Sequence, residues 1–223
     1  KTTQIAERLG ADGLLVSNEI HPGRAKILSR NVERMGFANT VVTNEDSKRL
    51  AEVFPEFFDK LLVDAPCSGE GMFRKDEQAR QEWSQENVRL CADRQREILE
   101  NAARLLRPGG RMVYSTCTFS PEENERQIEG FLERHPEFSI VPASPANLLP
   151  GLSKGRTEWT KNGCSPVRDT FRIWPHLTEG RDITWPFWKR QKRETRNRTE
   201  KKNPEKKGIK RDCPRGDGRA GNR

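Results

Sequence analysis

MVYSTCTFSPEENE, residues 112–125, joins a strand-like run to a turn and the start of a helix. The residues before Cys117 favour strands, and Ser120, Pro121 and Glu123 supply a capping residue, a first-turn proline and a capping-box acid. In open α/β sheets, ligands bind in the crevice outside the carboxyl ends of the strands, so Cys117 is placed like a reactive group. The alternative reading of this stretch alone is a small buried residue, which is what most free cysteines are.

Strand-like and helix-like segments also alternate upstream, which predicts an α/β fold with a mostly parallel sheet flanked by helices. Helices are expected over residues 21–36 and 88–106, and the latter has one apolar face. Three expected strands finish in an acid, namely those ending at Glu19, Asp46 and Asp64. Each acid alone could be a solvated loop residue, but together at strand ends they favour a polar small-molecule site.

The composition excludes several classes of protein. The 223 residues contain no run of about 18 apolar residues and no opening signal segment, so we expect a cytoplasmic protein. The five cysteines are odd in number, widely spaced and without a C-x-x-C pair. Neither a disulfide framework nor a metal site is therefore expected.

The positive charge of the chain is confined to its end. Residues 189–223 hold 15 Lys and Arg against 5 Asp and Glu, a net charge of +10. Because the whole chain carries +8, residues 1–188 carry −2. An argument for RNA binding from charge therefore depends on the tail alone.

Three motifs together resemble the Sun-family RNA cytosine-C5 methyltransferases, and most of all their bacterial RsmF-like members. The motifs are DAPCSGEG at 64–71, RPGG at 107–110 and STCT at 115–118, and the resemblance covers residues 1 to about 178. The cysteines of DAPC and STCT separate this family from methyltransferases of exocyclic amines, which carry N/D-P-P-Y at the comparable strand end. The resemblance implies a Rossmann-like class I fold, S-adenosyl-L-methionine as cofactor, and a monomer acting on RNA, with ribosomal RNA favoured over transfer RNA.

The resemblance also implies roles for single residues. Cys117 would be the nucleophile that attacks C6 of cytosine, and Cys67 would help to release the product. Asp64 would bind at the methionine or base side of the site. The remaining expected cofactor residues are Glu19 at the ribose, Asp46 beside adenine, and Lys1 as the last residue of the family's PGGK-type loop. Cys91 and Cys164 are expected to be structural.

Other functions stay open at this stage. The chain could bind RNA without catalysis, with residues 72–83, including Arg74, Lys75 and Trp83, facing the RNA. It could also be a cysteine hydrolase, but a hydrolase needs a general base. The candidate bases are His21, His135 and His176, none of which lies on a motif that pairs it with Cys117.

Both ends of the resemblance depart from the family pattern. The first strand and its glycine-rich loop are expected upstream of Lys1, so residues 1–180 are interpreted as an N-terminally truncated catalytic domain. The last strand is also expected to be missing, because GRDITWPFWKRQ stands where the family has G-E-G-H-[FY]-x-A-x-L. Residues 180–190 can be encoded by a set of codons that also encodes a second peptide in another reading frame. When these codons are read from the third base, they give E-G-H-Y-V-A-L-L-E-K. We therefore expect residues 181–223 to be a basic, disordered and out-of-frame tail, the alternative being an RNA-binding arm.

Overall fold

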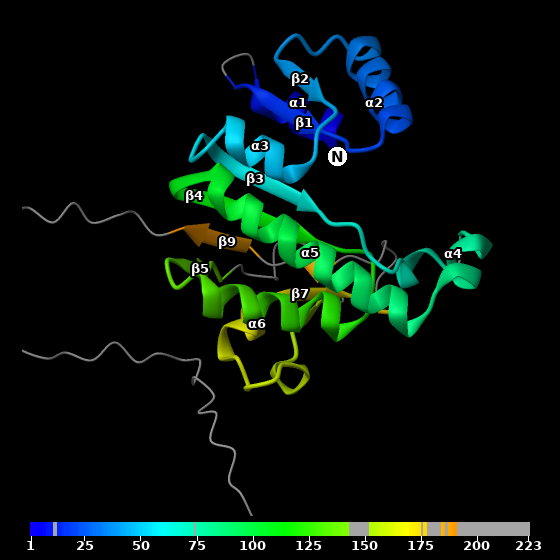
Figure 1. Cartoon of the computed structure of the whole chain (residues 1–223), viewed down its shortest axis with the longest axis vertical. Coiled ribbons are helices and arrows are strands. Elements are labelled where there is room, and N and C mark those ends of the chain that lie inside the picture. The colour runs from blue at the N-terminus through cyan, green and yellow to red at the C-terminus, as the bar shows by residue number, and fades with distance from the viewer. Residues whose placement is uncertain are drawn as a thin grey trace, which may run out of the picture. The chain divides into compact units, whose positions relative to one another are not determined.

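The computed structural model describes residues 1–10, 13–73, 75–142, 152–174, 176–177, 184–185 and 187–190, the last six by their backbone alone. The chain divides into two compact units, residues 1–54 and residues 55–223. Among the described residues, no helix is long and apolar enough to cross a membrane. Figure 1 shows the elements of each unit.

The first unit alternates helices and strands, as its sequence predicts. Strands β1 (Leu15–Asn18) and β2 (Thr40–Thr43) pair in parallel, with Leu15 opposite Thr40. The three helices are α1 (Thr2–Leu9), α2 (Pro22–Arg34) and α3 (Ser47–Val53). Pro22 stands at the start of α2, where a missing N–H costs nothing.

The second unit is built on a four-stranded sheet of order β3-β4-β9-β5. β3 and β4 are parallel, whereas β9 is antiparallel to both β4 and β5. The bounds of these strands are β3 (Phe58–Asp64), β4 (Leu106–Ser115), β5 (Phe138–Ile140) and β9 (Phe187–Arg190). A second, antiparallel sheet has the order β6-β7-β8, formed by β6 (Leu152–Lys154), β7 (Phe171–Ile173) and β8 (Thr184–Trp185).

Two long helices of the second unit supply most of its core. α5 (Gln85–Leu105) and α6 (Glu125–Arg134) are in contact with each other and are drawn along the same sheet in Figure 1. Their buried side chains meet those of β4, and the fully buried ones include Leu99, Phe131 and Met112. Each such side chain contributes roughly 1.5–3 kcal/mol by leaving water. Shorter helical elements are α4 (Glu77–Glu82), η1 (Glu70–Met72), η2 (Pro121–Glu123), η4 (Thr157–Trp159) and η5 (Ser165–Asp169).

The expectation that the last strand is missing is wrong, because β9 occupies a place inside the sheet. Its backbone pairs with β4 on one side and β5 on the other, with Trp188 opposite both Met112 and Ile140. Phe and Trp favour strands, and the slot between β4 and β5 offers hydrogen-bonding partners on both sides. Residues 184–185 and 187–190 are thus strands rather than tail. Residues 191–223, with the rest of the basic run and Cys213, lie outside the described residues, and the out-of-frame origin stays a prediction that sequencing the gene tests.

A buried ion pair joins the second sheet to α6. Arg172 on β7 and Glu125 at the start of α6 are 1% exposed each, and Arg172 Nε donates to Glu125 Oε1 over 2.7 Å. The same guanidinium lies 4.6 Å from the ring centre of Trp159 and donates to the Phe119 carbonyl over 3.0 Å. The pair therefore also supports the loop that follows Cys117.

Removal of Arg172 is expected to destabilise the protein strongly. The Arg172→Met variant leaves the Glu125 carboxylate buried without its counter-ion, which costs about 3–5 kcal/mol. Urea denaturation measures the free energy of unfolding, and Arg96→Met is the matched control because Arg96 pairs with Asp93 at the surface. The control should lose no more than about 0.5 kcal/mol. Equal losses in the two variants would contradict this account of the pair.

Candidate active site

The two motif cysteines meet at the carboxyl ends of neighbouring parallel strands. Asp64, the last residue of β3, lies opposite Ser115, the last residue of β4. The chain leaves both strands at this edge, and the Ala65 N–H still donates to the Ser115 carbonyl over 2.9 Å. The next residues of the two loops bring Cys67 Sγ to 3.1 Å from Cys117 Sγ. The sequence thus predicted correctly that Cys117 lies at a strand end.

The surroundings of Cys67 favour the protonated form of its thiol. The hydrogen bond to Cys117 and burial both raise the pKa of Cys67 far above its ordinary value. Cys67 therefore stays protonated at neutral pH and can donate its S–H to Cys117 Sγ. It also accepts the Cys117 backbone N–H over 3.2 Å. A thiol that donates to a neighbouring sulfur stabilises a thiolate there, which is the form that acts as a nucleophile.

The buried carboxylate of Glu123 holds together the two cysteine loops, which are the loop of Cys67 after β3 and the loop of Cys117 after β4. Its Oε2 accepts the Ser68 N–H over 3.0 Å and the Gln95 side-chain amide over 2.8 Å, and its Oε1 accepts the Ser68 hydroxyl over 2.5 Å. The Ser68 hydroxyl is also 2.9 Å from that of Thr118, next to Cys117. Tyr114 completes the network, because its hydroxyl lies 3.0 Å from Gln95 Oε1. The cysteines are therefore positioned by groups from α5, β4 and η2.

The capping role that the sequence predicted for Glu123 is wrong. Its carboxylate reaches Ser68 and Gln95 in other parts of the unit, and Ser120 makes no side-chain cap. Asn124, which sequence reasoning missed, braces the loop instead: its amide donates to the carbonyls of Thr118 and Ser120 over 3.1 and 2.8 Å. The hydrogen bonds of Glu123 to distant residues and of Asn124 within its own loop replace the local capping box.

The charge state of Glu123 is expected to make stability depend on pH. Burial raises the pKa of Glu123 above 4.5, so its protonated form favours the folded state, and that contribution is lost as pH rises through the raised value. Glu123→Gln is neutral at every pH. We expect its free energy of unfolding to rise relative to the wild type as pH increases above 4.5.

Urea denaturation at a series of pH values measures this difference. Glu129→Gln is the control for the loss of a buried carboxylate, because Glu129 is also buried and accepts the backbone N–H groups of Lys161 and Asn162. A difference between Glu123→Gln and wild type that does not change with pH would contradict the expectation.

Of the two acids of the first unit, Glu19 directly follows a strand as the sequence predicted, whereas β2 ends at Thr43, three residues before Asp46. Glu19 follows β1, and its Oε1 accepts the His21 N–H and the Arg24 guanidinium, each over 2.9 Å. Although burial acts in the opposite direction, these two donors hold the pKa of Glu19 below its ordinary value. Asp46 follows β2 and caps α3 by accepting the Arg49 N–H over 2.7 Å. Both carboxylates can accept hydrogen bonds from hydroxyl or amine groups.

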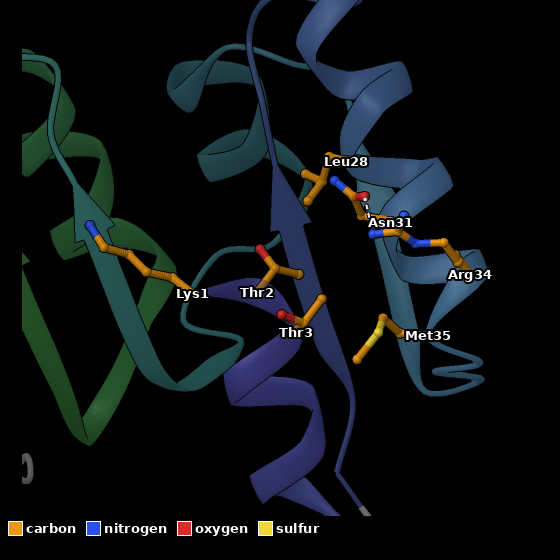
Figure 2. Close-up of a pocket in the computed structure, with 7 residues that line it drawn as sticks. All are labelled: Lys1, Thr2, Thr3, Leu28, Asn31, Arg34 and Met35. Carbon is orange, nitrogen blue, oxygen red and sulfur yellow. Dashed lines mark hydrogen bonds between the residues drawn. The ribbon is translucent and has the colours of Figure 1, made fainter. Parts of the chain in front are cut away.

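A separate open pocket of about 350 Å³ lies within the first unit (Figure 2). It is formed by the start of α1 and by α2, and its lining residues are Lys1, Thr2, Thr3, Leu28, Asn31, Arg34 and Met35. Lys1 is the only predicted site residue among the lining residues of this pocket. The motif cysteines belong to the second unit and do not line it.

Several other predicted residues can be placed within their units. Cys91 and Cys164 are buried, at 6% and 0% exposure, in agreement with a structural role. The ring of His135 is bound by Glu100 and Glu137, which does not suit a base for Cys117. Arg74 lies outside the described residues, and among those residues no group of three or more His, Cys, Asp or Glu could hold a metal ion.

Comparison with known proteins decides the family. Residues 1–183 match the model of the 16S rRNA methyltransferase RsmB/F family. The chain belongs to this family. Ribosomal RNA small subunit methyltransferase F of Escherichia coli O139:H28 is 43% identical over 159 residues, which are 71% of this chain and 33% of the relative. The chain thus spans about a third of the length of the curated relatives that it matches.

Solved structures agree with this membership of the RsmB/F family. The crystal structure of PH0851 has a TM-score of 0.74 and 32% identity, over 84% of this chain and 39% of that protein. NSun6 from Pyrococcus horikoshii, solved with SFG, has a TM-score of 0.71 and 25% identity, over 86% of this chain and 45% of that protein. The expected Rossmann-like α/β methyltransferase fold is confirmed, and the cofactor of such enzymes is S-adenosyl-L-methionine.

Proposed function

We propose that the full-length RsmB/F-family protein methylates C5 of a cytosine in 16S ribosomal RNA through a covalent bond between Cys117 and C6 of the base. The observation that carries the proposal is the pair of thiols 3.1 Å apart at the ends of two parallel strands. C5 of cytosine is a weak nucleophile, and a thiolate added at C6 converts the ring into an enamine that reacts at C5. One cysteine is enough for the addition to C6. A second cysteine in contact with it can also assist the elimination that releases the product.

The residues of the cysteine site account for each change of charge at sulfur. The Cys117 thiolate forms the S–C6 bond, and the ring electrons move to C5, which gains the methyl group. Transfer of the C5 proton to solvent water then restores the C5–C6 double bond as the S–C6 bond breaks and Cys117 leaves as a thiolate. The Cys67 S–H can donate to Cys117 Sγ before attack and again as the sulfur leaves. Asp64, at the end of β3, is proposed to accept from the donor's ammonium group or from the base amine.

The carboxylates of the first unit fit the polar parts of S-adenosyl-L-methionine. That cofactor supplies an electrophilic methyl group on a sulfonium when it is bound. Glu19 is held as an ionised acceptor, as ribose hydroxyls require, and we propose it for the ribose, with Asp46 beside adenine and Lys1 at the methionine end. SFG, with which the Pyrococcus horikoshii NSun6 was solved, is an S-adenosylmethionine analogue. We further propose that the enzyme acts as a monomer in the cytoplasm, where its ribosomal RNA substrate is found.

The proposed reaction is tested with the full-length protein and methyl-labelled S-adenosyl-L-methionine. Purified 16S ribosomal RNA and a transfer RNA pool are incubated separately, and the modified nucleosides are identified by mass spectrometry. We expect 5-methylcytidine in 16S ribosomal RNA. Label only in transfer RNA would overturn the choice of substrate. Label on an exocyclic amine, or RNA binding without any methyl transfer, would overturn the proposed chemistry.

A further inference from the structure

We propose that Glu70 is a positioning residue that ties the Cys117 loop to the segment 72–83, so that the placement of this segment helps to orient the nucleophile. The proposal rests on the proposed function, because it assigns Cys117 as the attacking group. Glu70 begins the short helix η1, three residues after Cys67. The structure gives its two carboxylate oxygens different partners.

One oxygen of Glu70 holds the backbone that follows the nucleophile. Glu70 Oε2 accepts the Phe119 N–H over 2.7 Å and the Thr118 hydroxyl over 3.0 Å. The next residue, Gly71, donates its N–H to the Cys117 carbonyl over 2.8 Å. Three consecutive residues of the Cys117 loop are therefore fixed by two consecutive residues of the DAPCSGEG motif.

The other oxygen of Glu70 holds the far end of the segment 72–83. Glu70 Oε1 accepts the Trp83 indole N–H over 3.0 Å, and Trp83 directly follows α4. The segment has its own supports, since Asp76 caps α4 and Arg80 donates to the Phe73 carbonyl over 2.8 Å. Figure 1 shows α4 beyond the carboxyl end of β3, away from the helices that accompany the sheet.

Through these hydrogen bonds, the position of the segment 72–83 affects the position of the reacting sulfur. Trp83 is 38% exposed, so a bound RNA can contact it, and a shift of its indole changes the position of Glu70. Glu70 in turn fixes the backbone at Thr118 and Phe119, immediately after Cys117. Reacting atoms must be held about 3–3.5 Å apart and aligned, and a displacement of about 1 Å can cost 100-fold in rate. Glu70 therefore acts through the Cys117 loop and needs no contact with the base.

The Glu70→Gln variant of the full-length protein tests the link. A carboxamide has one accepting oxygen in place of two, so it must turn its NH2 toward either the Phe119 N–H or the Trp83 N–H. We expect kcat to fall about tenfold or more, while KM for RNA changes by less than about threefold. Adduct formation with RNA that contains 5-fluorocytosine should slow by the same factor as kcat.

Glu129→Gln is the matched control for this substitution. Glu129 is 2% exposed and also accepts two backbone N–H groups, those of Lys161 and Asn162, over 2.7 and 2.8 Å. Its hydrogen bonds lie away from both cysteine loops, so it should lose stability without losing kcat. A kcat of Glu70→Gln equal to that of wild type, or an equal loss in the control, would overturn the proposal.

Trp83→Phe supplies a second test that leaves the contacts of the Cys117 loop in place. It removes the indole N–H and replaces the indole by a smaller phenyl ring at a partly exposed position, so folding should be preserved even if Glu70→Gln unfolds. We expect kcat to fall severalfold, about three- to fivefold, with no change in unfolding temperature. An unchanged kcat in this variant would overturn the link. If Cys117→Ala keeps its activity, the proposed function itself fails; if only the Glu70 and Trp83 variants behave like wild type, the failure is confined to the present proposal.

Discussion

Cys117→Ala is expected to abolish methyl transfer by the full-length protein. Without a sulfur at this position, no bond forms to C6 and C5 stays a weak nucleophile, so the rate should fall roughly 10⁴-fold or more. Cys67 does not replace the thiolate, because burial still raises the pKa of its thiol in this variant. Transfer of labelled methyl groups into 16S ribosomal RNA measures the loss.

The control for this prediction is Cys91→Ala. Cys91 is a buried cysteine on α5 whose Sγ contacts Asn87 over 3.8 Å, so its substitution removes a thiol without touching the proposed chemistry. Activity of this variant should stay within about threefold of wild type. Retained turnover in Cys117→Ala, or an equal loss in both variants, would contradict the assigned nucleophile.

Cys67→Ala is expected to accumulate a covalent complex with ordinary RNA. Cys117 can still add to C6, but the departing sulfur no longer receives the hydrogen bond that now spans 3.1 Å. Breakdown of the complex should therefore slow more than its formation, and turnover should fall roughly 100-fold or more. A denaturing gel, on which a protein joined to RNA migrates more slowly, measures the complex.

The double variant Cys67→Ala with Cys117→Ala is the control for the trapped complex. It should give no slowly migrating band, because the sulfur that forms the bond is gone. Repeated turnover by Cys67→Ala without any trapped complex would contradict the proposed role of Cys67 in release.

The local parts of the fold could be predicted from the sequence. Apolar runs that end in Asp64 and near Cys117 gave the strand ends correctly, because a strand and the turn after it depend on neighbouring residues. Parallel pairing then brought the two ends together, with Asp64 opposite Ser115. Whether Cys117 was reactive or merely buried could not be decided from its own stretch, because that depends on Cys67 in a different loop.

The hydrogen bonds that position the two cysteine loops could not be predicted, because they join residues that are distant in the sequence. Gln95 donates to the Pro66 carbonyl and to Glu123, and no local spacing joins these residues. A signal was nevertheless present, since Gln95 lies on the buried face of α5 together with Val88 and Leu99. A polar side chain on such a face requires a hydrogen-bonding partner. The prediction for Glu123 was wrong because its position also fits a capping box. In the structure its carboxylate accepts hydrogen bonds from Ser68 and Gln95 instead.

The last strand was missed for a different reason. Residues 187–190 differ from the expected family motif, yet their aromatic side chains favour a strand as well. β4 and β5 each offer a backbone edge, and β9 pairs with both. The space between β4 and β5 is thus filled by a segment that supplies backbone hydrogen bonds and has a strong strand propensity, even though it lacks the family's residues.

Trapping with RNA that contains 5-fluorocytosine tests the central claim most directly. Fluorine at C5 cannot leave as a proton does, so the ring stays bonded to the attacking sulfur after methyl transfer. The full-length protein is incubated with this RNA and S-adenosyl-L-methionine, digested, and the cross-linked peptide is sequenced by mass spectrometry. We predict that the nucleotide is attached to Cys117 within residues 112–125. Attachment to Cys67, or methylation with no attachment at all, would contradict the account.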